Sequence, residues 1–198
     1  MNEEVVFNHT LHKKFWKTIA QGIDVGSYYG DKSSAILYGL NNNLLSTEDV
    51  KELISSDTIC MACIYDEKCR ENDIESEHCD HCPLVVTDNV IQSLPKEYRT
   101  NNDGCLHGLY DYFCLCAELA NFIDMLEQTE YDYVLDEKIR HIMLFNTNWK
   151  PMYYMTNKED RWDRRDILHF RKLKLIKSLR QIARTIANLP VAPGVIII

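Results

Sequence analysis

The sequence is poor in residues that break helices, and it lacks long apolar runs. Its 198 residues include seven glycines and five prolines, where average usage would give roughly 14 and 10. Such a chain is more readily built from helices than from the many turns of a sandwich or barrel. No stretch approaches the ~20 apolar residues of a membrane span, and no apolar run follows the acidic start at Glu3 and Glu4. We therefore expect a mainly α, cytoplasmic protein with no membrane partner.

Common catalytic signatures are also missing. The sequence contains no phosphate-binding G-x-x-x-x-G-K-S/T, no G-x-G-x-x-G, no H-E-x-x-H and no G-x-S-x-G. Seven histidines are scattered along the chain, and their spacing assembles no catalytic centre. We expect that the protein is not an enzyme. An unrecognised catalytic site, within residues 121–165 or at a bound metal, is an alternative.

What the sequence has in excess is cysteine: eight residues, five of them between positions 60 and 82. Cys60, Cys63, Cys79 and Cys82 form the pattern C-x2-C-x15-C-x2-C, which lies within the spacing of structural zinc sites. Two thiolates separated by two residues lie on one tight turn, and two such turns complete a tetrahedron around Zn²⁺. Four thiolates leave no position for water, so the zinc is expected to be structural.

The ligand set leaves alternatives open. Cys69 lies between the two pairs, Cys105 begins a predicted helix, and His81 lies inside the second pair, so each is an alternate ligand. Cys114 and Cys116 lie about 200° apart around a helix axis, so we expect both in the core.

Apolar periodicity predicts a helical protein with at most a small β element. We expect residues 1–198 to form one compact domain. The four-cysteine zinc knuckle is expected to staple this domain. Residues 22–39, which are rich in glycine and serine, are expected to form a loop or small hairpin. Asn41–Asn43 are expected to interrupt the regular structure. Residues 85–94 show only a weak secondary-structure pattern, and residues 146–160 are expected to form a loop. Helices are expected over 12–20, from Ser46, and over 106–126, 133–145 and 163–188. The domain divides into an N-terminal helix and turn-rich segment (1–45), the zinc-knuckle region (46–105), core helices (106–145), a basic helix (161–189) and an apolar tail (190–198).

The charge is unevenly distributed. The net charge is −8, yet residues 161–184 carry nine basic and two acidic side chains, a local charge of +7 that leaves −15 for the remainder. On this helix, one face is predicted to carry Lys174, Lys177, Arg180 and Arg184. Such a face binds a partner protein, follows nucleic-acid phosphates, or lies on the acidic part of its own chain.

The tail ends in four β-branched residues, Val195, Ile196, Ile197 and Ile198. An exposed run of this kind favours association unless it is covered. We expect it to pair with its own fold, with a partner, or with a second copy in a homo-oligomer.

Several segments, taken in order, resemble small uncharacterised zinc-knuckle proteins encoded by bacteriophages of low-GC bacteria. The resemblance covers His12-Lys13-Lys14-Phe15-Trp16, Cys60-x-x-Cys63, Cys79-Asp80-His81-Cys82-Pro83-Leu84, Cys105 with Gly108-Leu109-Tyr110-Asp111, and Ile186-Ala187-Asn188-Leu189-Pro190-Val191. It implies that Cys105 accompanies the cysteine pairs near the metal. It also implies a bacterial host cytoplasm as the location. The chain differs by insertions at 22–43 and 121–165.

These observations favour a phage-type, zinc-stabilised protein-interaction module. It would bind and modulate a host protein, such as a component of a defence system or of transcription. The alternative is a nucleic-acid-binding module that uses the basic helix.

Overall fold

The computed structural model describes residues 4–24, 31–55, 60–71, 79–94, 99, 106, 108–128 and 161–198. The chain is mainly helical, as expected from its composition. The described residues form seven helices and no strand. The helices are α1 (His9–Asp24), α2 (Lys32–Asn41), α3 (Thr47–Leu53), α4 (Met61–Arg70), α5 (Asp88–Ser93), α6 (Leu109–Gln128) and α8 (Arg161–Ala187).

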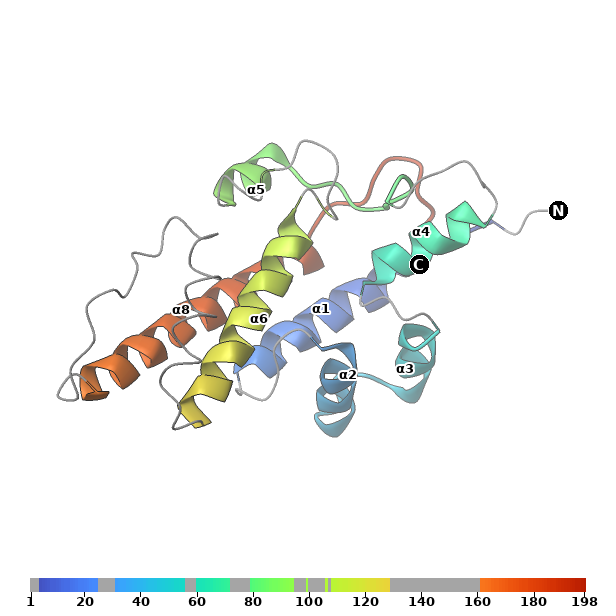
Figure 1. Cartoon of the computed structure of the whole chain (residues 1–198). Coiled ribbons are helices and arrows are strands. Elements are labelled where there is room, and N and C mark those ends of the chain that lie inside the picture. Colours follow the sequence, from blue (N-terminus) through green and yellow to red (C-terminus); the bar gives the residue numbers. More distant parts are fainter. Residues whose placement is uncertain are drawn as a thin grey trace.

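The core forms where α1 and α6 pack against the long helix α8 (Figure 1). The fully buried ring of Trp16 on α1 meets the Phe113 ring of α6 edge to face, at a centroid distance of 5.4 Å. Aliphatic residues of α8, including Leu179 and Ile186, are equally buried. Burial of side chains this large supplies most of the free energy that holds three helices together.

Most of the predicted helices are present, with shifted ends. The helix expected over 12–20 runs from His9 to Asp24, and the helix expected over 163–188 runs from Arg161 to Ala187. Helix α8 ends just before Leu189 and Pro190, because the proline ring cannot continue a helix. The segments 133–145 and 146–160 lie outside the described residues.

The prediction of a loop or hairpin over 22–39 is wrong for residues 32–39, which belong to α2. Asp31 caps this helix by accepting a hydrogen bond from the Ser34 N–H. Gly39 lies where α2 meets Leu45, and a Cβ there would approach Leu45 Cδ1 to 2.5 Å. Glycine and serine therefore permit close packing and capping here rather than a turn.

The tail pairs with its own chain. Phe7 and Ile197 form a parallel β-bridge, and Leu84 and Val191 form an antiparallel one. The Phe7 N–H donates to the Ile196 carbonyl at 2.8 Å. The side chains of Ile197 and Ile198 nevertheless stay 52% and 68% exposed. Backbone pairing therefore holds the tail, while its apolar side chains face solvent.

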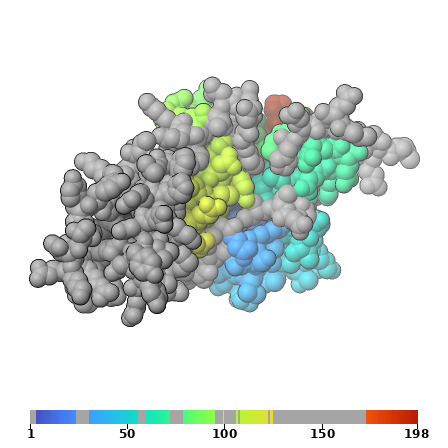
Figure 2. All heavy atoms as spheres, in the orientation of Figure 1, coloured from blue at the N-terminus to red at the C-terminus, as the bar shows by residue number. Residues whose placement is uncertain are grey.

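Helices α2 and α3 lie together at one edge of the molecule, and α5 lies at the opposite edge (Figure 1). On the face in Figure 2, α2, α3, α4 and α6 all reach the surface. None of the described helices combines the length and apolarity needed to cross a membrane.

Candidate functional site

Both C-x-x-C pairs form tight turns. Cys60 is the N-cap of α4, and its carbonyl accepts hydrogen bonds from the N–H groups of Cys63 (3.0 Å) and Ile64 (3.2 Å). The Cys79 carbonyl accepts from the Cys82 N–H at 3.2 Å. Cys79 has a φ of 75°, a left-handed conformation that closes the second turn. Each pair therefore has its two thiols on one short turn.

A buried carboxylate joins the second turn to α4. Asp66 is 1% exposed, and its two oxygens accept hydrogen bonds from the backbone N–H groups of Cys79 (3.1 Å) and His81 (2.8 Å). Arg70, one helical turn further along α4, donates its Nε–H to Asp66 at 3.0 Å. Because the carboxylate is held from both sides, α4 fixes the position of the second cysteine turn.

The thiols of the two turns share one buried region. A hydrogen bond to Cys63 and burial both raise the pKa of the Cys60 thiol, while the neighbouring His12 ring acts in the opposite direction. Burial raises the pKa of the Cys82 thiol to about 11, and a hydrogen bond from the Leu84 backbone partly offsets it. Proximity to Cys60 raises this pKa further. Cys82 therefore lies in the electrostatic range of the first turn.

As the side chains stand, no three His, Cys, Asp or Glu residues in the described part of the chain converge closely enough to hold a metal ion. The four-cysteine zinc knuckle therefore stays a prediction. Of the alternate ligands, Cys105 lies outside the described residues. Cys69 lies on α4, and its thiol is hydrogen-bonded to Tyr65, whose pKa is raised to about 12 by burial and by this contact. His81 is held by its backbone on Asp66.

The two cysteines predicted for the core lie on α6. Cys116 is 1% exposed, and its burial raises the pKa of its thiol to about 12. Cys114 is half-buried, and burial raises the pKa of this thiol too. Neither belongs to the two cysteine turns, and Cys116 is part of the apolar core.

A basic groove of about 720 Å³ lies between α5 and the second half of α8. Three of the four side chains predicted for the basic face line it. Among the described lining residues there is no carboxylate. These residues are Thr87, Val90, Lys177, Arg180, Gln181, Arg184, Thr185, Asn188, Leu189 and Pro190. We call this surface the basic groove.

The rest of the basic helix is partly neutralised within the chain. Lys172 forms an ion pair with Asp124 of α6, so the predicted contact with the acidic part of the chain exists at this point. Lys174, the fourth residue of the predicted face, is exposed but does not line the basic groove. The groove is therefore formed by the C-terminal half of α8 together with α5.

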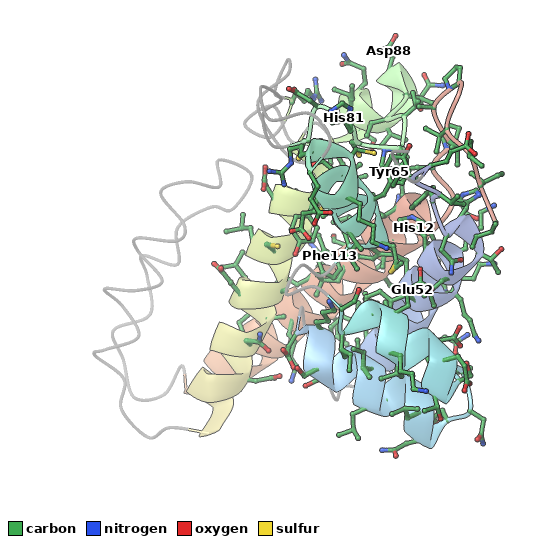
Figure 3. All side chains as sticks on the ribbon, turned by 90° about the vertical axis from the view of Figure 1, so that its right-hand side faces the viewer. His12, Glu52, Tyr65, His81, Asp88 and Phe113 are labelled. Atoms are coloured by element: carbon green, nitrogen blue, oxygen red, sulfur yellow. The ribbon has the colours of Figure 1, made fainter. Side chains whose placement is uncertain are left out.

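His12 was missed by the sequence analysis. Figure 3 shows His12 on α1 and Tyr65 on α4. The His12 side chain is fully buried. Its ring lies 5.6 Å from that of Phe7, and the Phe7 ring lies 5.7 Å from that of Tyr65. A lone histidine on the apolar face of a helix gives no local signal of a site. Its importance depends on Cys60, which lies 48 positions further along the chain.

Comparisons with known proteins identified no match. No protein-family model, curated protein or solved structure matches the chain. The resemblance to phage zinc-knuckle proteins therefore stays a prediction.

Proposed function

We propose that the chain is a non-catalytic helical module that binds the sugar-phosphate backbone of a nucleic acid in the basic groove. The observation that carries this proposal is the alignment of Lys177, Arg180 and Arg184 along one groove without a carboxylate among its described lining residues. A local field of this kind binds phosphates even when the net charge of the protein is −8.

The spacing of the three cations suits a phosphate backbone. Lys177 and Arg184 are seven residues apart on α8, a rise of about 10 Å. Along one strand of B-DNA the phosphates advance 3.4 Å per nucleotide, so the groove covers about three of them. Thr87 and Gln181 add polar groups at the same surface. Phosphate contacts of this kind position a nucleic acid without selecting its sequence.

The test is fluorescence anisotropy with a labelled 20-mer, single-stranded and double-stranded, at several salt concentrations. Wild-type binding is expected to weaken steeply with salt, and each of Lys177→Ala, Arg180→Ala and Arg184→Ala should reduce the slope of log K against log salt by about 1. The matched control is Lys51→Ala. Lys51 is exposed on α3, which lies at the opposite edge of the molecule from α5 (Figure 1).

Absence of binding by the wild type, or binding that the triple alanine variant retains, contradicts the proposal. A labelled polyglutamate peptide distinguishes nucleic acid from an acidic protein partner. Equal or tighter binding of the peptide at the same salt concentration would assign the groove to an acidic protein.

We propose that a structural Zn²⁺ holds the two cysteine turns together, with its thiolate ligands drawn from Cys60, Cys63, Cys79 and Cys82. Four thiols on two turns provide the donor set that structural zinc prefers, and Asp66 already fixes one turn to the other. Burial of Cys60 and Cys82 favours their neutral forms, so a bound dication is what would stabilise the thiolates. Elemental analysis of protein purified under reducing conditions should give one zinc per chain, and a strong chelator should lower the Tm.

A second candidate function is that of the protein-interaction module expected from the sequence. Its support is an exposed apolar surface at the paired ends of the chain, which we call the terminal patch: Val6, Ile196, Ile197 and Ile198. A photo-crosslinking residue at position 197 should capture a bacterial protein if this patch binds a host partner. The same residue at position 51 is the control. Crosslinking of the chain to itself would instead indicate a homo-oligomer.

A further inference from the structure

His12 is held by the last turn of α8. Its Nε2 lies 3.0 Å from the Ile186 carbonyl oxygen. A carbonyl only accepts hydrogen bonds, so Nε2 carries the hydrogen and donates it. Ile186 lies in the last turn of α8, where carbonyls have no partner within the helix. The position and rotation of the imidazole ring are thereby fixed.

This hydrogen bond leaves the other ring nitrogen without a partner. In the neutral ring, Nδ1 carries the lone pair, and this atom is buried and makes no hydrogen bond. An unsatisfied buried acceptor costs about 1–3 kcal/mol. Histidines that bind metals have this arrangement: one nitrogen donates to a backbone carbonyl, which orients the ring, and the other nitrogen is directed at the metal.

The first cysteine turn lies beside the His12 ring. The Cys60 thiol is in contact with His12 and is hydrogen-bonded to Cys63. Two thiolates bound to one zinc at ~2.3 Å each are separated by roughly 3.8 Å, which is within the range of a hydrogen bond between thiols. Cys82 of the second turn lies within electrostatic range of Cys60, whose proximity raises the pKa of the Cys82 thiol. Cys60 therefore interacts with both His12 and Cys63 and lies within electrostatic range of Cys82.

From this geometry we infer that His12 Nδ1 is a ligand of the zinc, together with the thiolates of Cys60, Cys63 and Cys82. This inference rests on the zinc site proposed above and replaces Cys79 in its ligand set. Cys79 then serves the turn through its backbone, which donates to Asp66 and accepts from Cys82. Convergence on the metal requires the thiols to rotate toward the fixed imidazole ring. The metal would thereby tie α1 to both cysteine turns, and Ile186 would tie the same ring to α8.

The test uses Co²⁺ added to the full chain under reducing conditions, because the intensity of thiolate-to-cobalt absorption reports the number of bound thiolates. His12→Gln keeps an amide donor for Ile186 but removes the ring nitrogen, and we expect it to weaken cobalt binding by at least about 10-fold. Cys79→Ser should leave the charge-transfer intensity unchanged, whereas Cys82→Ser should reduce it by about a third. His9→Gln is the matched control, since the His9 ring stacks on His12 at 6.2 Å.

A second readout separates ligation from a structural role. In ¹⁵N spectra of histidine-labelled wild-type protein, zinc should shift the Nδ1 resonance of His12 while Nε2 stays protonated. Loss of about a quarter of the charge-transfer intensity in Cys79→Ser, with normal binding by His12→Gln, overturns the inference but leaves the four-thiolate zinc site intact. Wild-type protein that takes up neither zinc nor cobalt overturns the zinc site itself.

Discussion

The carboxylate of Asp66 and the backbone N–H of His81 are joined by a 2.8 Å hydrogen bond across fifteen positions of the chain. Asp66 belongs to α4, and His81 belongs to the second cysteine turn. The Asp66 side chain is almost fully buried. A buried carboxylate is stabilised strongly by each hydrogen bond that it accepts. This hydrogen bond therefore positions the second cysteine turn against α4, the helix that begins at Cys60 of the first turn.

Replacement of this carboxylate should destabilise the fold. Asp66→Asn keeps the size of the side chain, but it turns one acceptor into a donor that faces backbone N–H groups. We expect the free energy of unfolding to fall by about 1–3 kcal/mol, measured by urea denaturation. Glu71→Gln is the control, because Glu71 is exposed at the C-cap of α4. Equal stability of Asp66→Asn and wild type would show that the carboxylate is not needed.

The ion pair between Lys14 and Asp49 should make stability depend on acid pH. Burial alone would raise the pKa of Asp49, but hydrogen bonds from Lys14 and Ser46 outweigh burial and hold this pKa below its ordinary value. The folded state therefore favours the carboxylate. Its contribution is complete above the unfolded pKa of about 3.9 and is lost as the pH falls through the lower folded pKa.

Asp49→Asn tests this dependence, because asparagine still accepts a hydrogen bond but carries no charge. The variant should lose up to about 1 kcal/mol near neutral pH and match the wild type once the pH has fallen below the lowered folded pKa of Asp49. Urea denaturation at several pH values measures both. Glu48→Gln, exposed in the same helical turn, is expected to have a smaller effect. A constant difference across all pH values would contradict the assignment to Asp49.

Backbone pairing of the tail predicts a proline-specific effect. The Ile198 N–H donates to the Phe7 carbonyl at 3.2 Å. Ile198→Pro removes this donor and should lower the free energy of unfolding by about 1 kcal/mol. Ile198→Ala keeps the donor and removes only an exposed side chain, so it should change stability by less than about 0.5 kcal/mol. Equal effects of the two variants in thermal denaturation would mean that the side chain matters rather than the hydrogen bond.

Gly39 should not tolerate a methyl group. In an open helix, alanine would gain about 1 kcal/mol over glycine. Here the added Cβ would lie 2.5 Å from Leu45 Cδ1 and 3.0 Å from Thr18 Cγ2, and overpacking costs about 1–3 kcal/mol. We expect Gly39→Ala to have a lower Tm than wild type. Gly22→Ala, whose nearest contact is a Tyr38 ring atom at 3.3 Å, should be tolerated better. A Gly39→Ala variant at least as stable as wild type would contradict the close packing.

Sequence reasoning succeeded where the signals were local. Ser46 followed by acidic residues in the first turn predicted the start of α3, and in the structure Ser46 and Asp49 form a reciprocal capping box there. It failed at α2, where Ser33, Ser34 and Gly39 resemble turn residues. In the structure, Ser33 and Ser34 lie in the first turn of α2 after its N-cap Asp31, and Gly39 permits close contact with Leu45. The contact of Gly39 depends on tertiary packing.

The candidate sites divide in the same way. The cysteine spacing and the basic helix face were visible in the sequence, because each repeats at a fixed interval. The participation of α5 in the basic groove was not, since Thr87 and Lys177 are brought together only by the fold. His12 and Ile186 are 174 positions apart, and no short-range pattern connects them.

The packing of α1 against α8 also determines when the protein can fold during its synthesis. The buried face of α1, with Phe15, Trp16 and Ile19, leaves the ribosome long before the helix that covers it is completed at Ala187. At about 5–20 residues per second, this face waits roughly 10–35 s for its partner. During that interval the aromatic and aliphatic side chains of this face stay uncovered by α8.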